Sequence, residues 1–288
     1  MQKFVFVLLM FFLIFTAPLQ ARSLLVFAPH PDDEAISLGA FIADKIRAGY
    51  SATGVIITDG EAFAKAVRAN RLSKKIVLAP IDFLKLGRIR RKEGAAALSH
   101  LGIKEKNQIF MGYPGNAVNR IYKSQKPDAL IRSRATRQRF GLACWRGDKR
   151  QVAFTRKNLT ADLDEILKAT NPDIIIMPVH FDSNSDHSAT NALLMERLQA
   201  LGMTPTIKGY LVHQGSRRVY PKPFGYRPDK SINDPVGFPP PERYKPTPAG
   251  NTAKEKALRC HKTQLRLKDG FLLSFIRKEE IYWSIPPR

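Results

Sequence analysis

The segment over residues 24–34 constrains the fold more strongly than any other part of the 288-residue chain. It begins with an apolar run over residues 24–28, which is too short for an ordinary helix and is typical of a strand buried on both faces of a parallel sheet. Pro29 and Pro31 should end this strand, because neither has an N–H group and each biases the preceding residue toward extended backbone. Apolar residues then recur at helical spacing from Ala35 onward. The segment therefore predicts a strand, a loop and a helix.

Four polar side chains stand in the predicted loop at the carboxyl end of this strand: His30, Asp32, Asp33 and Glu34. In open α/β sheets, ligands bind at this end of the strands. An imidazole and a carboxylate three positions apart can share one divalent ion, while a second carboxylate beside them handles a proton. In the alternative interpretation, the loop is solvated and its aspartates cap the next helix. Capping needs only one such residue and explains neither His30 nor the pair of aspartates.

A second segment repeats this architecture further along the chain. Residues 174–178 form another short apolar run that ends at a proline, a polar stretch continues to His187, and a helix is predicted from Ser188. Catalytic zinc sites usually have three protein ligands and a water, so His187 would complete a set begun by His30 and Asp33. Taken alone, His187 would normally be interpreted as a surface imidazole at the capped start of a helix.

Both segments resemble the motifs of a known family. Residues 28–34 resemble the AHPDDE signature of the PIG-L / LmbE family of zinc-dependent N-acetylglucosamine de-N-acetylases, with Pro29 as an addition between the alanine and the histidine. Residues 178–187 resemble the family's P-x-x-x-D-x-H-x-D-H motif, and weaker similarity extends over residues 24–265. The resemblance implies hydrolysis of the N-acetyl amide of an amino sugar, carried by a glycan or a glycolipid.

The resemblance also implies roles for individual residues. In the family, zinc is bound by the histidine and the second aspartate of the first motif and by the final histidine of the second motif. These positions correspond to His30, Asp33 and His187 in this sequence. The first aspartate of the first motif is the general base, which corresponds to Asp32. Since histidine and carboxylate ligands suit several divalent ions, the native metal stays open.

One position of the second motif departs from the family pattern. Asn184 stands where the family usually has a histidine credited with stabilising the oxyanion, and its amide can donate a hydrogen bond but cannot carry a positive charge. Asp186 would orient a neighbouring group. The candidate catalytic residues are therefore Asp32, Asn184 and Asp186. His180 and His213 could supply the missing imidazole in contact with substrate, or could be structural histidines.

Weaker matches give two further candidates for substrate binding. Glu61 follows a predicted strand over residues 51–58 in a step similar to the family's T-x-G-E. Arg90 lies in a predicted helix over residues 90–102 that resembles the family's R-x-x-E helix and should end at a glycine cap. The basic stretch over residues 62–92 could form a lip of the site or a solvated face.

The remaining pattern is uneven. Short strands are predicted over residues 109–112 and 209–213, and a closing helix over residues 254–267. Two stretches lack clear periodicity and are predicted to be irregular: residues 116–150 and the proline-rich residues 220–250.

The first residues match a secretory signal peptide. A basic start at Lys3, an apolar run over residues 4–15 and small residues before Ala21 are its usual parts. We expect cleavage after Ala21 and export to the periplasm or out of the cell. Alternatively, residues 4–19 remain as a membrane anchor, since they approach the roughly 20 residues that span a bilayer. In either case residues 22–288 would form a single deacetylase domain.

The chain carries a formal net charge of +22, which favours binding to polyanions or serves only solubility. For an exported protein, the anionic lipids and acidic glycans of a cell envelope are the expected polyanions, and nucleic acid is an unlikely partner. The two cysteines, Cys144 and Cys260, could form a disulfide in an oxidising compartment or remain free thiols. The oligomeric state is left open.

These patterns predict one α/β domain with a Rossmann-like three-layer fold, a mainly parallel sheet and an active site at the strands' carboxyl ends. The predicted enzyme is a zinc-dependent deacetylase that hydrolyses an N-acetyl amide. Two rival hypotheses remain. The protein could bind glycans or anionic lipids without catalysis and keep a relic metal site, or it could be an amidase or esterase for another class of substrate. An intact Asp32 argues against the first rival, because binding alone has no use for a base.

Overall fold

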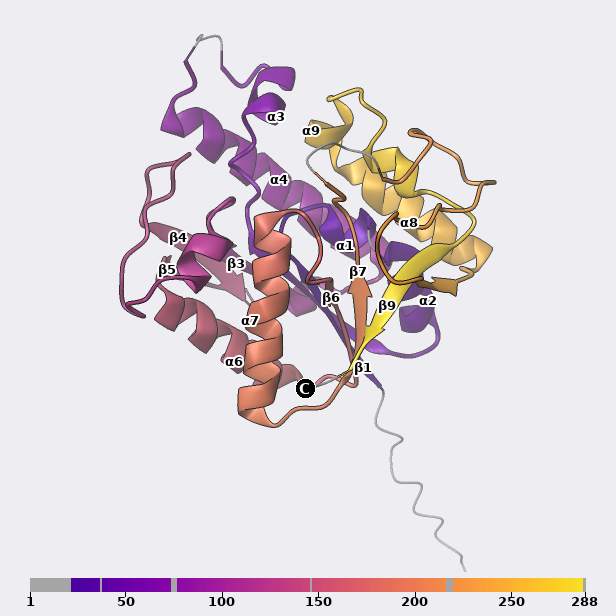
Figure 1. Cartoon of the computed structure of the whole chain (residues 1–288). Helices are drawn as coiled ribbons and strands as arrows, with labels where there is room; N and C mark the ends of the chain where they lie inside the picture. The colour runs from indigo at the N-terminus through magenta and orange to yellow at the C-terminus, as the bar shows by residue number, and fades with distance from the viewer. Residues whose placement is uncertain (1–21, 37, 74–76, 146, 216–219, 287–288) are drawn as a thin grey trace, which may run out of the picture.

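The structure is a computed structural model that describes residues 22–286 apart from residues 37, 74–76, 146 and 216–219. Within this part of the chain, a nine-stranded sheet has the strand order β5-β4-β3-β2-β1-β6-β7-β9-β8 (Figure 1). The central strands, from β3 through β1 to β7, are mutually parallel. They are β1 (Ser23–Ala28), β2 (Ser51–Thr58), β3 (Gln108–Tyr113), β6 (Ile174–Pro178) and β7 (Thr206–Tyr210).

Antiparallel strands complete both edges of the sheet. Beside β3, a hairpin consists of β4 (Phe140–Trp145) and β5 (Asp148–Ala153). Beside β7 lies β9 (Glu280–Ile285), which also pairs with β8 (Glu242–Tyr244). The sheet is therefore mixed, and the predicted parallel arrangement holds for its centre.

Helices cover both faces of the sheet, so the predicted three-layer α/β fold is confirmed (Figure 1). The helices of one face are α2 (Gly39–Arg47), α4 (Pro80–Leu101) and α8 (Pro248–Cys260). Those of the other face are α5 (Val118–Tyr122), α6 (Arg156–Thr170) and α7 (Ser185–Leu201). Shorter elements are α1 (Asp33–Ile36), α3 (Ala64–Ala69), α9 (Lys262–Leu265) and the 3₁₀ turns Glu105–Asn107 and Leu272–Phe275.

The packing of β1 explains its unbroken apolar run. Val26 packs in the cluster that contains α2, α4 and α8, whereas Leu25 and Phe27 pack in the cluster that contains α5, α6 and α7. All three side chains are fully buried. Because burial of each such side chain contributes about 1.5–3 kcal/mol, the strand is held firmly at the centre of the molecule.

The order of the central strands reverses at β1. The chain passes from β1 to β2 and β3 on one side, and later adds β6 and β7 on the other. At such a switch point the loops leaving neighbouring strands diverge, which opens a crevice at the carboxyl ends of the strands. The two polar segments predicted from the sequence follow the two strands at this point, β1 and β6.

Several predicted helix boundaries were wrong. Helix α4 begins at Pro80 rather than Arg90, because a proline suits the first turn of a helix and the Asp82 carboxylate accepts a hydrogen bond from the N–H of Ala79. Its predicted end at Gly102 is confirmed by the left-handed φ of 97° there. The helix predicted from Ala35 is divided into α1 and α2, and the closing helix is divided into α8 and α9.

The two stretches predicted to be irregular contain regular elements. Residues 116–150 include α5, strand β4 and the start of β5, and residues 220–250 include β8 and the start of α8. Strand β5 begins with four consecutive polar residues, so its conformation depends on pairing with β4 rather than on its own sequence. Strand β9 was not predicted.

Cys144 and Cys260 are free thiols in the structure, so the free-thiol alternative holds. The signal peptide or anchor predicted over residues 1–21 lies outside the described residues. In the described part of the chain, no helix is both long enough and apolar enough to cross a membrane.

Candidate active site

A cavity of about 210 Å³ lies at the carboxyl ends of the parallel strands. Its lining includes a residue from the segment after each of them: His30 after β1, Gly60 after β2, Gly115 after β3, Asn184 after β6 and His213 after β7. The cavity therefore occupies the crevice at the switch point, as expected from the sheet order.

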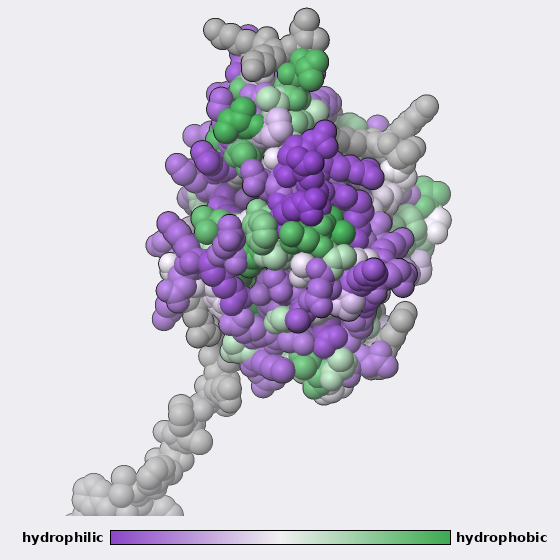
Figure 2. Space-filling model, turned by 90° about the vertical axis from the view of Figure 1, so that its left-hand side faces the viewer, coloured by the Kyte–Doolittle hydropathy of each residue, from purple (hydrophilic) through white to green (hydrophobic). Residues whose placement is uncertain are grey.

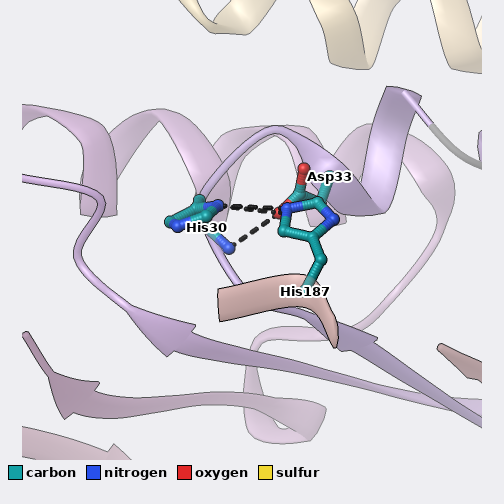
Figure 3. Close-up of side chains that lie close together, drawn as sticks. All are labelled: His30, Asp33 and His187. Carbon is teal, nitrogen blue, oxygen red and sulfur yellow. Dashed lines mark hydrogen bonds and ion pairs between the residues drawn. The ribbon is translucent and has the colours of Figure 1, made fainter. Parts of the chain in front are cut away.

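Three side chains of the ligand type meet beside this cavity (Figure 3). His30 lies in the loop after β1, Asp33 begins α1, and His187 lies in the first turn of α7. The His30 Nδ1 lies 3.2 Å from Asp33 Oδ2, and the His187 Nε2 lies 3.1 Å from the same oxygen. The two nitrogens are 3.3 Å apart. The structure thus brings together the three residues predicted to bind a metal.

These spacings fit a single tetrahedral ion. When metal–ligand bonds are about 2.0–2.1 Å long, two ligands of a tetrahedral zinc ion lie roughly 3.3 Å apart. The three measured separations are close to that value. Two of the three residues, His30 and Asp33, also line the cavity, as an open catalytic metal site requires. The residues present therefore fit zinc or a similar divalent ion.

A second group of possible ligands shares His187, since Asp182, His187 and His213 also bring ligand atoms within 4.8 Å of one another. The Asp182 carboxylate, however, already accepts hydrogen bonds from the N–H groups of Asn184, Val212 and His213. Its oxygens lie 3.1 Å from His187 Nδ1 and 3.3 Å from His213 Nδ1. A carboxylate behind a metal-binding histidine fixes the orientation of the ring. Asp182 is therefore the partner of two imidazoles, and the first group is the one compatible with a metal ion.

Asp186 supports His30 in the same way. Its Oδ2 lies 3.3 Å from His30 Nε2, and its oxygens accept hydrogen bonds from the N–H groups of Asn116 and Val118. The side chain is fully buried and is not part of the cavity lining. This placement suits the orienting role predicted for Asp186 and gives it no direct contact with a substrate.

The ionisable groups of the metal site shift one another's pKa values. For His30, burial lowers the pKa, but hydrogen bonds to Asp186 and Asp33 outweigh this effect and raise the pKa to about 9. For Asp33, burial opposes ionisation, yet the charges of His187 and His30 hold the pKa of the carboxyl well below its usual value. The Asp33 carboxylate is therefore ionised, as a metal ligand must be.

Asp32 lines the cavity from a strained position in the loop. Its φ of 128° is rare for a residue other than glycine, and such backbone costs about 1–3 kcal/mol. The Asp32 N–H donates to Glu34 Oε2 over 2.9 Å, and Arg90 donates to Asp32 Oδ2 over 3.1 Å. Burial raises the pKa of Asp32, and the charge of Arg90 partly offsets this rise. A carboxyl with a raised pKa beside a metal site is suited to general base catalysis.

Arg90 and Glu61 hold the walls of the cavity. Arg90 lines the cavity but is buried, and it donates to the carbonyl oxygens of Gly60 and Pro31, each over 2.6 Å. Glu61 is also buried, and its oxygens accept the Gly115 N–H at 3.1 and 3.0 Å. Burial raises the pKa of Glu61 to about 7. Their contacts in the structure are with the protein's own loops.

The structure brings His213 to the cavity and leaves His180 outside it. His213 lines the cavity, and its ring meets the His187 ring edge-on with centroids 4.8 Å apart. His180 is exposed, packs edge-on against Phe181 and is absent from the cavity lining. Asn184 also lines the cavity, and its Oδ1 caps α7 by accepting the Asp186 N–H over 2.9 Å.

The sequence analysis missed two features of the site. Asp182 lies within the second motif, but no role was predicted for it. The available signal was that the second nitrogen of a histidine ligand needs a hydrogen-bond partner. An apolar wall of the cavity was not predicted, because its residues come from separate segments that only tertiary packing brings together. This wall includes Phe63, Leu267, Phe271 and Leu272.

Similar folds occur among solved structures. The N,N'-diacetylchitobiose deacetylase from Pyrococcus horikoshii is 19% identical, with a TM-score of 0.56 and coverage of 93% of this chain and 85% of that chain. The A40926 pseudoaglycone deacetylase Dbv21 is 17% identical, with a TM-score of 0.58 and coverage of 93% and 98%. GalB, the 4-carboxy-2-hydroxymuconate hydratase from Pseudomonas putida, is 18% identical, with a TM-score of 0.56 and coverage of 93% and 97%. The TM-scores establish a shared fold, and the names of these proteins show that this fold hosts more than one chemistry.

No curated protein matches the chain. The family model described as PIG-L, GlcNAc-PI de-N-acetylase, matches residues 25–198, which include most of β1, all of β6, the three candidate metal ligands and Asp32. The match extends over more than half of the chain, and the protein therefore belongs to the PIG-L family.

Proposed function

We propose that the protein is a zinc-dependent deacetylase that hydrolyses the N-acetyl amide of an N-acetylated amino sugar, either in a glycan or in a glycolipid. The observation that carries this proposal is the convergence of His30, Asp33 and His187 beside a cavity that Asp32 also lines. Membership of the PIG-L family supports it, as do the solved deacetylases of similar fold, whose names include N,N'-diacetylchitobiose and the A40926 pseudoaglycone.

His30, Asp33 and His187 would hold the zinc ion, and Asp186 and Asp182 would fix the two imidazoles. When bound there, zinc supplies Lewis-acid chemistry that polarises a water molecule and the amide carbonyl. The carboxylate of Asp32 takes a proton from the attacking water and later returns a proton to the nitrogen of the leaving amine. Arg90 holds the Asp32 carboxylate in place during both transfers.

Two side chains are available for the acetyl carbonyl oxygen as negative charge develops on it. Asn184 lines the cavity and has an amide N–H₂ that its helix cap does not use. His213 also lines the cavity, and its Nδ1 lies 3.3 Å from Asp182 Oδ1. We propose that these two residues together take the place of the histidine that the family motif usually has at position 184.

The test is a comparison of the wild type with the Asp32→Asn variant. Amine release from a panel of N-acetylated amino sugars, glycans and glycolipids should fall by roughly 10²–10⁴-fold in the variant, the usual contribution of a positioned acid–base group. Zinc content should not change, because Asp32 is not a ligand in this proposal. Asp164→Asn is a matched control, since Asp164 pairs with Arg197 on the helical layer of α6 and α7.

Two outcomes would contradict the proposal. Full activity in Asp32→Asn would show that another group handles the proton. No amine release by the zinc-loaded wild type from any acetylated substrate would favour a glycan- or lipid-binding protein with a relic site, or an amidase or esterase for another class of substrate. Hydrolysis of ester substrates alone by the wild type would select the last of these.

A further inference from the structure

A buried carboxyl–imidazole pair lies behind Asp32, outside the cavity lining. Glu34 and His261 are both 0% exposed, and the His261 Nε2 lies 3.2 Å from Glu34 Oε1. Burial lowers the pKa of His261, but its contact with Glu34 outweighs this effect and raises the pKa. His261 stands at the junction of α8 and α9, so packing joins the end of the chain to the first motif.

The other oxygen of Glu34 reaches the backbone of the active-site loop. Glu34 Oε2 accepts the N–H of Asp32 over 2.9 Å. Since φ is the rotation about the bond between N and Cα, an anchor on this N–H bears directly on the φ of 128° at Asp32. The C=O of Asp32 is fixed as well, because it accepts the N–H groups of Ala35 and Ile36. One carboxylate thus connects His261 to the strained residue.

Stability alone gives a poor reason for this pair. A buried ion pair often adds nothing over apolar residues of the same volume, because both groups lose their hydration. Glu34 belongs to helix α1, which has only four residues, so capping this helix would add little to the stability of the protein. The strained conformation of Asp32, in contrast, persists only if its surroundings hold it.

We propose that Glu34 and His261 are positioning residues that hold Asp32 in its strained orientation toward the cavity, with Glu34 as the anchor and His261 as its support. This inference rests on the proposed function, in which Asp32 acts as the general base. Besides the hydrogen bonds that its C=O accepts, Asp32 is then held by Arg90 on its carboxylate and by Glu34 on its N–H.

The chain offers a matched control for this arrangement. Glu280 and Lys254 form a second buried pair, 2.7 Å apart, and Glu280 accepts the N–H groups of Ala40 and Phe41 at the start of α2. Lys254 lies on α8, the helix that ends just before His261. This second pair has the same construction, but the backbone that it anchors is not part of the cavity lining.

The experiment compares two double variants of the full chain, Glu34→Leu with His261→Leu, and Glu280→Leu with Lys254→Met. Replacing both members of each pair leaves no single buried charge behind, so each variant can fold. In the first, kcat should fall by about 10–100-fold with KM and bound zinc unchanged, and the Asp32 amide should exchange its hydrogen faster. The second should keep the wild-type kcat and the wild-type exchange at Asp32. His261→Gln, whose amide can still donate to Glu34, should recover part of the loss in kcat.

Amide exchange separates this inference from the proposed function, because it needs no substrate. If the wild type hydrolyses none of the substrates, faster exchange at Asp32 in the first double variant alone still supports the anchor. Wild-type exchange at Asp32 in that variant, or equal effects of the two double variants on kcat, would overturn it.

Discussion

The buried ionisable groups of the site favour a bound cation. Three carboxylates, Asp33, Asp182 and Asp186, surround the two imidazoles of His30 and His187. With both imidazoles neutral, as metal ligands must be, the ionised carboxylates of Asp33 and Asp182 would leave a buried negative charge without compensation. Protons on the imidazoles or a divalent ion can compensate this charge, which agrees with the raised pKa of both histidines. Loss of a metal should therefore be accompanied by uptake of protons.

A different carboxyl makes the stability of the protein depend on pH. Burial raises the pKa of Glu61 from 4.5 to about 7, so the folded protein keeps a proton that the unfolded chain releases between these values. Its contribution to stability is fully present below about pH 4.5 and is lost as the pH rises to about 7. The loss amounts to about 3 kcal/mol at 1.36 kcal/mol per pH unit. Glu61→Gln should remove this dependence, because an amide keeps an acceptor for the Gly115 N–H and does not titrate.

Urea unfolding of the metal-free wild type and Glu61→Gln at a series of pH values measures this effect. The free energy of unfolding of the variant relative to the wild type should increase by about 3 kcal/mol from pH 4.5 to pH 8. A difference that stays constant with pH would show that the pKa of Glu61 is ordinary.

At the residue scale, the sequence predicted what local spacing determines. His30, Asp32 and Asp33 lie within four consecutive residues, so their proximity to one another could be predicted without coordinates. His261 could not be connected with Glu34, since no local pattern indicates which buried carboxylate a histidine at a helix junction will meet. For the same reason, His180 and His213 stayed equivalent until the fold placed His213 in the cavity and His180 on the surface.

The inner face of helix α4 packs against the active-site loop that contains the first motif. A Cβ atom at Gly94 would lie 2.8 Å from Ile56 Cδ1 and 3.2 Å from Pro31 Cβ, so a side chain at this position would require β2 or the active-site loop to shift. Arg90, one turn earlier, reaches the same loop through its guanidinium. The position of the loop therefore depends on this close contact.

Gly94→Ala should destabilise the protein by about 1–3 kcal/mol, because the added methyl group overpacks the contact with Ile56 and Pro31. Helix propensity alone predicts the opposite sign, since alanine is favoured over glycine in a helix by about 1 kcal/mol. Urea unfolding decides between the packing argument and the helix-propensity argument. A variant more stable than the wild type would refute the packing argument. Ala96→Gly, at an exposed position of the same helix, calibrates the propensity term.

At the element scale, the central strands were predictable and the edges were not. Buried strands such as β1 and β6 read as continuous apolar runs. In the β4–β5 hairpin, β4 is mainly apolar whereas the first four residues of β5 are polar and exposed, so neither strand shows a clear alternation and the two form because they pair with each other. The start of α4 was missed because its first turns carry a mixture of basic and apolar residues.

The whole molecule carries an excess of positive charge. Figure 2 shows a face on which hydrophilic residues predominate and hydrophobic residues form smaller groups. With 47 lysines and arginines against 25 aspartates and glutamates, the net charge is +22. A field of this sign attracts anionic surfaces and is screened by salt over a distance of about 10 Å at 0.1 M.

Purified protein should therefore bind vesicles of anionic lipid at about 0.05 M salt and be released from them at about 0.5 M salt. Cosedimentation measures both states, with vesicles of neutral lipid as the control. Equal binding to neutral and anionic vesicles would contradict an electrostatic origin, and failure to bind anionic vesicles at low salt would mean that the charge serves solubility alone.

The metal site joins distant parts of the chain, because His30 and His187 are separated by 157 positions and meet only when β1 and β6 pair. An ion that binds only the folded protein stabilises it, by about 4 kcal/mol when its free concentration is 1,000 times its dissociation constant. If the ion is zinc, as proposed above, its supply in the compartment where the chain folds would govern the abundance of the protein as well as its activity. A cell short of zinc would lose the protein itself, through unfolding and proteolysis, before any excess of inactive enzyme accumulated.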